Sequence, residues 1–554
     1  MTETAATSVT AASRLLESLE QLGVELVFGL PGVHNLAIWK ALSDSDVRLV
    51  GVRHEQTAVY AADGYARATG RLGVAVVTTG PGAANTLGAT GEAMASGSPV
   101  LVIATDIATT LRREGVYGGT LHETRDQTAM FGPVTKGARL LVDPEEIAAA
   151  ALESGSLALA APSGPVYLGV PTDLLRRDVP ANAPRTELPR ATPPEPLAAA
   201  VDFDRASAVL AGAERPLIWA GGGALRAGAG PLVGELARKL AAPVITTFNA
   251  RGLLARDHPC AVPGPVHARE VGALWDESDV VLAIGSDFDG TMTQNWQMPA
   301  PARLISINVD QTEASKNYRS ELTLLGDARR VLERLVPRIE ARDGLGELAR
   351  RLSAIRAAVA ASVESDDPQA AAFLGIMHRA LPADAVVVTD MCIPGYWLAG
   401  YWQVPKPRKL AYPLGWGTLG FGFPASLGAA LADAGPTICV CGDGGFMYAC
   451  GELATVVQER IALTIVLVND GGYGMLRYDQ VQAGEQPFGV DLVNPDFPAL
   501  ARAFGIPVRT VQGFGADFER ALRSSVDAGE PQMIEVYASL TPPPTTSPRW
   551  YRKP

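Results

Sequence analysis

The chain has 554 residues, of which 47% are hydrophobic and 19% are charged, and its formal net charge is −12. A length of this order corresponds to about three domains of ordinary size. The negative charge argues against a general nucleic-acid-binding surface or an anionic-membrane surface.

The sequence has no feature of an exported or membrane-embedded protein. The segment 1–20 lacks a basic start followed by a long apolar run, and no stretch reaches the roughly 18 apolar residues of a membrane span. The five cysteines are few for this length, and Cys439 and Cys441 fall in an expected buried strand. We therefore expect reduced thiols, no membrane partner and a cytoplasmic location.

Apolar runs alternate with amphipathic or alanine-rich segments along the chain. The runs VELVFGL, LGVAVVTT, PVLVIAT and PVYLGV, for example, are separated by segments such as EEIAAAALESGSLAL. Nearly continuous apolar strands that alternate with helices are typical of parallel sheets covered on both faces. A proline-rich stretch at 179–200 and an expected helical connector at 341–369 divide the chain. We predict an α/β fold with three doubly wound parallel-sheet domains, which are N-terminal (1–180), central and half-Rossmann (197–340), and C-terminal (365–554).

Two histidines stand on loops of the first domain. His34 lies in VFGLPGVHN and His122 in LHETRDQ, and the chain has only 6 histidines in all. An imidazole titrates near neutral pH and can relay protons to a reaction intermediate. We treat both residues as candidate catalytic groups, with loop histidines satisfied by the backbone as the alternative.

The central domain opens with PLIWAGGGALRAGAG, which reads as a strand, a glycine turn and a helix. The segment lacks the full G-x-G-x-x-G pattern of a dinucleotide site. A tight turn in a half-Rossmann domain is therefore the expectation there.

Small polar residues follow two apolar strands of the third domain. The run TICVC is followed by Gly442, Asp443, Gly444 and Gly445, and the run ALTIVLV is followed by Asn469. Ligands of open parallel sheets bind beyond the carboxyl ends of the strands, and glycines there let a diphosphate approach the backbone of a following helix, expected at 447–460. One carboxylate, one amide oxygen and the Gly471 carbonyl form an oxygen-rich set that suits Mg²⁺. Taken singly, Asp443 and Asn469 could also be turn caps.

The Gly-Asp-Gly motif and the later asparagine resemble the signature of the thiamine diphosphate (ThDP) enzymes. The segment RHEQTAVYAADGYARATG resembles their pyrimidine-binding segment, with Glu55 as the catalytic acid, and TTGPGAANTLGA resembles their GPG-x-x-N turn. The resemblance implies that Asp443, Asn469 and the Gly471 carbonyl hold Mg²⁺ on the cofactor diphosphate. It also implies that Glu55 promotes formation of a C2 ylide, which reacts through an enamine intermediate.

LGWGTLGFGFPASLGAALA resembles the family segment that cradles the pyrimidine from the third domain. In this resemblance Leu419 bends the cofactor and Gly417 offers its carbonyl to the exocyclic nitrogen. In the family the acid and the metal site come from two subunits. The resemblance therefore implies a homodimer or homotetramer with the active site at the subunit interface.

Within the family, FGLPG, RHEQ and GPG-x-x-N resemble the acetolactate synthase and 2-oxo acid decarboxylase branch. Asp479 stands where an acetolactate synthase has a tryptophan, and Thr291 where it has an arginine. These differences argue against a true acetolactate synthase, and they leave FAD as a cofactor that is conceivable but not favoured.

The expected activity is a ThDP- and Mg²⁺-dependent 2-oxo acid decarboxylase or carboligase. A lyase or hydrolase acting on a 2-hydroxy ketone, a diketone or a 2-hydroxyacyl-CoA is the first alternative. The HET-x-DQ segment is similar to that of 5-guanidino-2-oxopentanoate decarboxylases, the second alternative, for which Asp479, Asp287 and Asp289 are conceivable partners of a cationic substrate. A degenerate, non-catalytic family member is a further alternative. The basic tail 542–554, with Trp550 and Tyr551, could cover the site or dock at a subunit contact.

Overall fold

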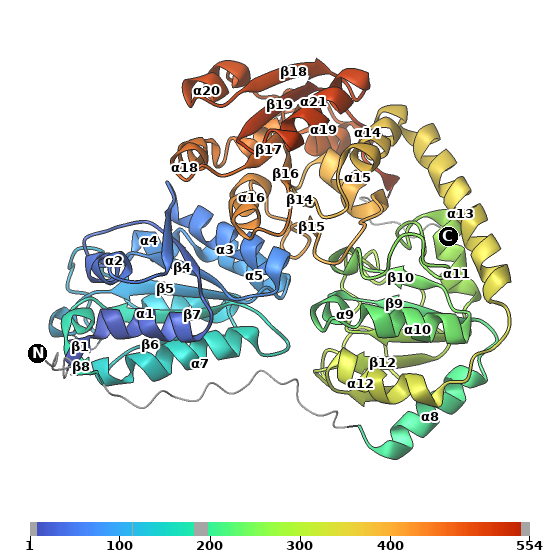
Figure 1. Ribbon diagram of the computed structural model, residues 1–554, viewed down its shortest axis with the longest axis horizontal. Helices are drawn as coiled ribbons and strands as arrows, with labels where there is room; N and C mark the ends of the chain where they lie inside the picture. Colours follow the sequence, from blue (N-terminus) through green and yellow to red (C-terminus); the bar gives the residue numbers. More distant parts are fainter. Residues whose placement is uncertain (1–7, 114, 182–197, 545–554) are drawn as a thin grey trace, which may run out of the picture.

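The structure is a computed structural model that describes residues 8–113, 115–181 and 198–544 (Figure 1). It contains three parallel sheets with helices packed on them, which confirms the expected α/β fold. Trp550 and Tyr551, which sequence analysis connected with the active site, lie outside the described residues.

The first domain is built on a six-stranded sheet in the order β3-β2-β4-β5-β7-β6. Its strands are β2 (Leu26–Gly29), β3 (Arg48–Gly51), β4 (Gly73–Val77), β5 (Val100–Asp106), β6 (Gly137–Leu140) and β7 (Val166–Pro171). Its helices are α1 (Ala11–Gln21), α2 (Leu36–Ser43), α3 (Glu55–Thr69), α4 (Pro81–Ala84), α5 (Leu87–Ala95), α6 (Gln127–Phe131) and α7 (Ile147–Leu159). Every residue of β4, β5 and β7 is buried, which explains their unbroken apolar sequences. A short antiparallel pair, β1 (Ser8–Thr10) with β8 (Asp178–Pro180), joins the two ends of the domain.

The central domain has a five-stranded sheet in the order β10-β9-β11-β12-β13. Its strands are β9 (Pro216–Ala220), β10 (Val244–Thr246), β11 (Val280–Ile284), β12 (Leu304–Asn308) and β13 (Leu322–Leu325). Its helices are α8 (Ala200–Ala211), α9 (Gly222–Arg226), α10 (Gly230–Leu240), α11 (Arg269–Glu277) and α12 (Ala328–Leu335). The long helix α13 (Leu345–Asp366) then runs along the outside of this domain up to the third (Figure 1).

The third domain has a six-stranded sheet in the order β15-β14-β16-β17-β19-β18. Its strands are β14 (Val386–Thr389), β15 (Leu410–Ala411), β16 (Thr437–Gly442), β17 (Leu463–Asn469), β18 (Val508–Gln512) and β19 (Gln532–Tyr537). Its helices are α14 (Pro368–Ala380), α15 (Ile393–Tyr401), α16 (Gly422–Leu431), α17 (Asp443–Phe446), α18 (Leu453–Gln458), α19 (Gly474–Gln482), α20 (Phe497–Ala503) and α21 (Ala516–Asp527).

Helices α3 and α16 join the first domain to the third by close backbone packing (Figure 1). Gly64 of α3 lies against the carbonyl oxygen of Ala425, and Gly428 of α16 lies against that of Ala61, so closely that a methyl group on either glycine would overlap the oxygen. Both helices are buried over most of their lengths. Small residues at a crossing let two helix backbones approach each other, and here they fix the relative position of two domains.

Among the described residues, no helix is both long enough and apolar enough to cross a membrane. All five cysteines are free thiols. Cys439 and Cys441 are fully buried in β16, as the apolar run predicted.

We expect Gly428→Ala to destabilise the protein by about 1–3 kcal/mol, because the added methyl group forces α3 and α16 apart. The shift is measured as a change in the urea midpoint of the cofactor-free protein. Gly346→Ala in α13 is the matched control, since a methyl group there has only the Arg350 guanidinium nearby, at 3.8 Å. Alanine in an open helix position stabilises by up to about 1 kcal/mol. Equal midpoints for the two variants would contradict the close-packing argument.

Candidate active site

The parallel pairing of β16 with β17 brings Asp443 and Asn469 together. Gly442 pairs with Val468, so the residues that follow leave the sheet side by side at its carboxyl edge. The side-chain amide of Asn494 donates hydrogen bonds to Asp443 Oδ2 and, at 3.2 Å, to Asn469 Oδ1. The Asp443 and Asn469 oxygens thus share the Asn494 NH2 group as a donor. A cluster of oxygens that is bridged by a donor favours positive charge. Sequence analysis gave Asn494 no role, because only the fold places it here.

The donor set fits a divalent cation. Asp443 is 1% exposed, and its Oδ1 is buried with no hydrogen-bond partner among the described residues. Asp470 lies close by, and burial together with the Asp443 charge raises the pKa of Asp470 to about 6. A buried carboxylate with an unpartnered oxygen is costly unless a cation compensates it. Carboxylate, amide and carbonyl oxygens are the ligands that Mg²⁺ uses beside phosphate and water.

The loop after Asn469 is held by Arg477. The Gly471 amide donates to Asn469 Oδ1 at 3.2 Å, and Gly471 has a φ of 79°, in the left-handed region that favours glycine. The Gly471 carbonyl accepts from Arg477 Nη2 at 3.2 Å. The same oxygen accepts the Leu492 amide at 3.0 Å, so both of its lone pairs are engaged and the carbonyl is held in place by two donors.

The glycine turn is shaped by its neighbours in the third domain. A methyl group on Gly444 would lie 2.7 Å from the Tyr473 ring, and one on Gly445 would lie 2.8 Å from Asp390 Oδ2 and 3.3 Å from Leu419 Cδ1. The Leu419 side chain therefore reaches the turn. Gly442 is the residue that caps α17.

The helix expected at 447–460 is wrong as a single element. The chain forms the short helix α17, a 3₁₀ turn η7 (Cys450–Glu452) and the separate helix α18. The break falls at residues 447–449, where Ala449 leaves the helical region with a φ of −136° and begins the 3₁₀ turn.

Asp390 directly follows β14 and lies at the same edge of the sheet. Its carboxylate accepts from the backbone amides of Gly420, at 3.0 and 3.1 Å, and Met391, at 2.7 Å. Burial raises the pKa of Asp390 to about 6. Asp390 thereby ties the end of β14 to the loop that carries Gly417 and Leu419.

Glu55 is the first residue of α3 in the first domain and is 9% exposed. His54 caps the helix, because its Nδ1 accepts the Gln56 amide at 3.2 Å. Glu55 Oε2 accepts from the side-chain amide of Asn85 at 3.0 Å, and Oε1 lies over Gly82. The GPG-x-x-N turn thus supplies both neighbours of the candidate acid, the open glycine and the orienting asparagine.

The loop around Gly417 is attached to the first domain. Gly417 has a φ of 68°, which favours glycine there. On either side of it, the Trp416 amide and the Thr418 hydroxyl donate to Glu92 Oε2 at 3.0 and 3.4 Å. Glu92 is fully buried and also accepts from Arg67 at 3.1 Å. Sequence analysis missed Glu92 and Arg67, because their partners are far away in the chain.

The structure brings His34 and His122 together. Their ring centroids are 5.2 Å apart at an interplanar angle of 60°. Burial and the neighbouring His122 lower the pKa of His34. Among the described residues, His34 Nε2 and His122 Nδ1 are buried without a hydrogen-bond partner, so each ring keeps a nitrogen available to a ligand.

Gln127, the last residue of the LHETRDQ segment, supports the GPG turn. Its Oε1 accepts the Gly80 amide at 2.6 Å, and its Nε2 donates to the Thr105 carbonyl at 2.8 Å. The residue is buried, so it positions the turn that carries Asn85 and Gly82. Sequence analysis assigned it no role.

Two of the three carboxylates considered for a cationic substrate are engaged elsewhere. Asp287 forms an ion pair with Lys316 at 2.8 Å, and Asp289 accepts the amides of Thr291 and Met292, both at 2.9 Å. Both acids belong to the central domain.

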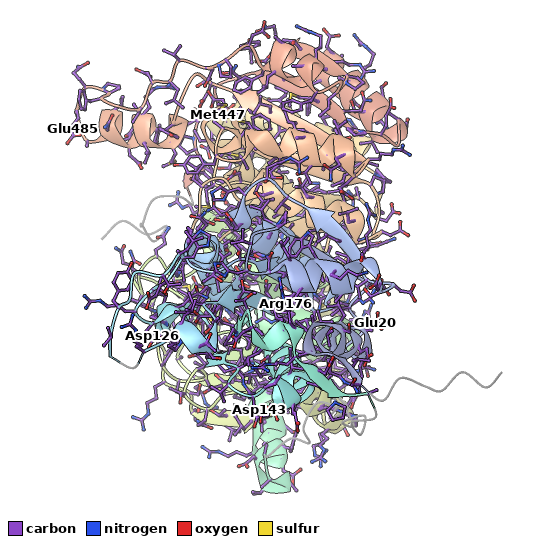
Figure 2. The ribbon with its side chains drawn as sticks, turned by 90° about the vertical axis from the view of Figure 1, so that its left-hand side faces the viewer. Glu20, Asp126, Asp143, Arg176, Met447 and Glu485 are labelled. Atoms are coloured by element: carbon purple, nitrogen blue, oxygen red, sulfur yellow. The ribbon has the colours of Figure 1, made fainter. Side chains whose placement is uncertain are left out.

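The third carboxylate, Asp479, lies on the exposed helix α19, which leads into an arm that projects from the third domain with Glu485 at its outer end (Figure 2). Met475, one helical turn before Asp479, packs on the core that includes Ile393 of α15. Burial and nearby acidic groups, Asp479 among them, raise the pKa of Tyr396 on α15.

Three family models match successive parts of the chain. They describe the thiamine pyrophosphate (ThDP) enzymes: the N-terminal TPP binding domain at residues 9–130, the central domain at 203–335 and the C-terminal TPP binding domain at 391–536. The candidate acid and the oxygen cluster fall in the two TPP binding domains.

Similar proteins match over nearly the whole chain. A probable 2-ketoarginine decarboxylase of Pseudomonas aeruginosa is 36% identical over 96% of this chain and 94% of its own. A probable acetolactate synthase large subunit of Methanocaldococcus jannaschii is 30% identical over 95% and 91%. The large subunit of acetolactate synthase isozyme 3 of Escherichia coli is 31% identical over 90% and 89%. The chain therefore belongs to the ThDP enzymes, in their acetolactate synthase-like branch, and is an enzyme that makes or breaks carbon–carbon bonds.

Proposed function

We propose that this protein is a Mg²⁺-dependent decarboxylase or carboligase of a 2-oxo acid. The observation that carries the proposal is the buried Asp443 oxygen without a partner, placed beside Asn469 at the ends of two adjacent parallel strands. A cation at this point compensates the carboxylate and anchors a diphosphate at the glycine turn.

The residues of the third domain bind and orient the cofactor in this proposal. Asp443, Asn469 and the Gly471 carbonyl hold Mg²⁺, and the turn from Gly442 to Gly445 receives the diphosphate. Leu419 would support the bend of the bound cofactor, and the Gly417 carbonyl would accept from its exocyclic nitrogen. When bound, ThDP supplies a carbon nucleophile that attacks the 2-oxo group and takes up the electron pair left by carbon dioxide.

The residues of the first domain handle protons. Asn85 holds Oε2 of Glu55, which leaves Oε1 to share a proton with N1′ of the pyrimidine. His34 and His122 exchange protons with the substrate through their free ring nitrogens. Protonation of the carbon that has lost carbon dioxide would give an aldehyde. Addition of that carbon to a second carbonyl compound would give a 2-hydroxy ketone. The same residues would serve the alternative, a lyase or hydrolase of a 2-hydroxy ketone, diketone or 2-hydroxyacyl-CoA.

We further propose a homodimer or homotetramer in which Glu55 of one subunit faces the metal site of another, and a cytoplasmic location in keeping with the five free thiols. FAD remains a cofactor that we do not favour, because Thr291 replaces the arginine of acetolactate synthases.

The proposal is tested by separating cofactor binding from cofactor activation. We expect Glu55→Gln to bind ThDP with nearly the wild-type Kd in calorimetry, and to slow deuterium exchange at thiazolium C2 by roughly 10²-fold or more, because the acid is lost. Asp443→Ala should instead lose Mg²⁺-dependent ThDP binding, because the anchor is lost.

The wild-type enzyme is then given pyruvate, benzoylformate and 5-guanidino-2-oxopentanoate, and carbon dioxide is measured. Release from any of them supports the decarboxylase. Normal C2 exchange without carbon dioxide from any 2-oxo acid would favour the lyase or hydrolase, and an inert C2 proton would indicate a degenerate family member.

A second candidate function is the decarboxylation of a cationic 2-oxo acid such as 5-guanidino-2-oxopentanoate. Two observations favour it. Asp479 stands where acetolactate synthases have tryptophan, and its charge contributes to the raised pKa of Tyr396 on α15. A relative of nearly equal length is named a probable 2-ketoarginine decarboxylase. A carboxylate and a phenol ring are suitable partners for a guanidinium group.

We expect Asp479→Asn to lower kcat/KM for 5-guanidino-2-oxopentanoate by about tenfold, which corresponds to the loss of one charge-assisted contact. The kcat/KM for an uncharged 2-oxo acid of similar length should stay within about twofold, since only the ion pair is removed. Glu485→Gln, which removes an exposed acid beyond the same helix, is the matched control. Equal losses for charged and uncharged substrates would exclude Asp479 as the cation-recognising group.

A further inference from the structure

A buried carboxylate of the third domain, Glu452, holds the backbone directly before the candidate acid. Glu452 belongs to η7 and is 1% exposed. Its Oε1 accepts the amides of Arg53 and His54, both at 3.0 Å, and its Oε2 accepts the Arg53 amide at 3.1 Å and the Thr455 hydroxyl at 2.6 Å. The contact therefore crosses from the third domain to the first and ends one residue before Glu55.

The position of this carboxylate has electrostatic consequences. Helix α3 is 15 residues long and begins at Glu55, so its positive end points toward Glu452. The amides of Arg53 and His54 precede the helix and have no partner within it. Glu452 satisfies both amides at once, and this fixes the direction in which the chain enters α3.

Two other contacts across the same domain boundary, both beside η7, are of a different kind. Arg48 pairs with Glu459 at 3.1 Å, and the Arg53 guanidinium donates to Gln458 at 2.7 Å, in both cases through side chains that are at least partly exposed. They join the two domains but do not contact the main chain beside Glu55. Glu452 alone among these three side chains is buried and bonded to backbone amides, so it has a specific geometric effect on the acid.

Glu452 also belongs to the connection that carries the candidate diphosphate site. Asp443, α17 and η7 follow one another between β16 and β17, and α18 then packs behind them. A short, ordered segment therefore runs from the metal-binding turn of the third domain to the start of α3. Any shift of η7 changes the entry of α3 and with it the position of the Glu55 carboxylate.

We propose that Glu452 is a positioning residue for Glu55: its bidentate contact with the Arg53 and His54 amides keeps the Glu55 carboxylate directed toward its reaction partner. This inference rests on the proposed role of Glu55 as the cofactor-activating acid. It assigns Glu452 no contact with substrate or cofactor.

The contact between Glu452 and the backbone before Glu55 is tested on the cofactor-free protein by hydrogen-exchange mass spectrometry. In Glu452→Gln, which keeps the shape and removes the charge, we expect the amides of peptides spanning residues 51–57 to exchange at least about tenfold faster, because a neutral amide oxygen accepts more weakly than a carboxylate and the NH2 group at the position of Oε2 cannot accept from Arg53. The matched control, Glu459→Gln, breaks the neighbouring Arg48 ion pair and should leave this peptide at the wild-type rate. Unchanged exchange in Glu452→Gln, or equal acceleration in Glu459→Gln, would overturn the proposal.

The effect of Glu452 on cofactor activation is measured at saturating ThDP and Mg²⁺. Glu452→Gln should slow deuterium exchange at C2 by about tenfold while the calorimetric Kd for ThDP changes by less than about threefold, since the binding groups are intact. A residue that only stabilises the fold would weaken binding and leave the exchange rate of the bound cofactor unchanged, which would contradict the proposal.

Glu452→Asp covers the case in which the glutamine variant does not fold. Its shorter side chain keeps the charge and can reach fewer of the three donors. The backbone amide exchange rate should therefore lie between those of the wild type and Glu452→Gln, and the C2 exchange rate between those of the wild type and Glu55→Gln. Wild-type rates in both measurements would overturn the proposal. If the wild type itself shows no C2 exchange, the proposed function fails, whereas the amide-exchange result still decides whether Glu452 fixes the start of α3.

Discussion

The parallel register of β16 with β17 is the constraint on which the rest of the site depends. It delivers a carboxylate and an amide oxygen to one point, where a carboxylate oxygen is left buried and unpartnered. Burying a charge without a partner is unfavourable, and a second acid, Asp470, is close enough to be affected. The strands around the site are buried on both faces and stabilise the domain despite this cost. A cation with a bound diphosphate would offset it.

The first and third domains of one chain are joined by contacts that leave little freedom. Glycines at the α3–α16 crossing fix the distance between the first and third domains, Glu92 of the first domain holds the Gly417 loop, and Glu452 of the third domain holds the start of α3. These contacts run in both directions across one boundary. The position of Glu55 therefore depends on the third domain as much as on its own helix.

Sequence patterns predicted the features that depend on local chemistry. Buried strands read as unbroken apolar runs, so the three-domain α/β fold and the strand ends that carry Asp443 and Asn469 followed from the sequence. Asn494, Gln127 and Glu452 did not follow, because their partners lie far away in the chain or on another domain. The single helix expected after the glycine turn was wrong, because an apolar period does not reveal where the backbone leaves helical geometry, here at Ala449.

The proposed function assigns specificity and chemistry to different elements of this fold. The histidine pair and Glu55 stand on loops and a helix start of the first domain, whereas Asp479 is carried by α19, none of whose residues is buried. A helix with so little burial can change its side chains at small cost in stability, because few packing contacts depend on them. The backbone just before the acid, in contrast, is held by Glu452, a buried side chain of another domain. Substrate preference can therefore vary on α19 while the proton-handling groups remain fixed by the packing that surrounds them.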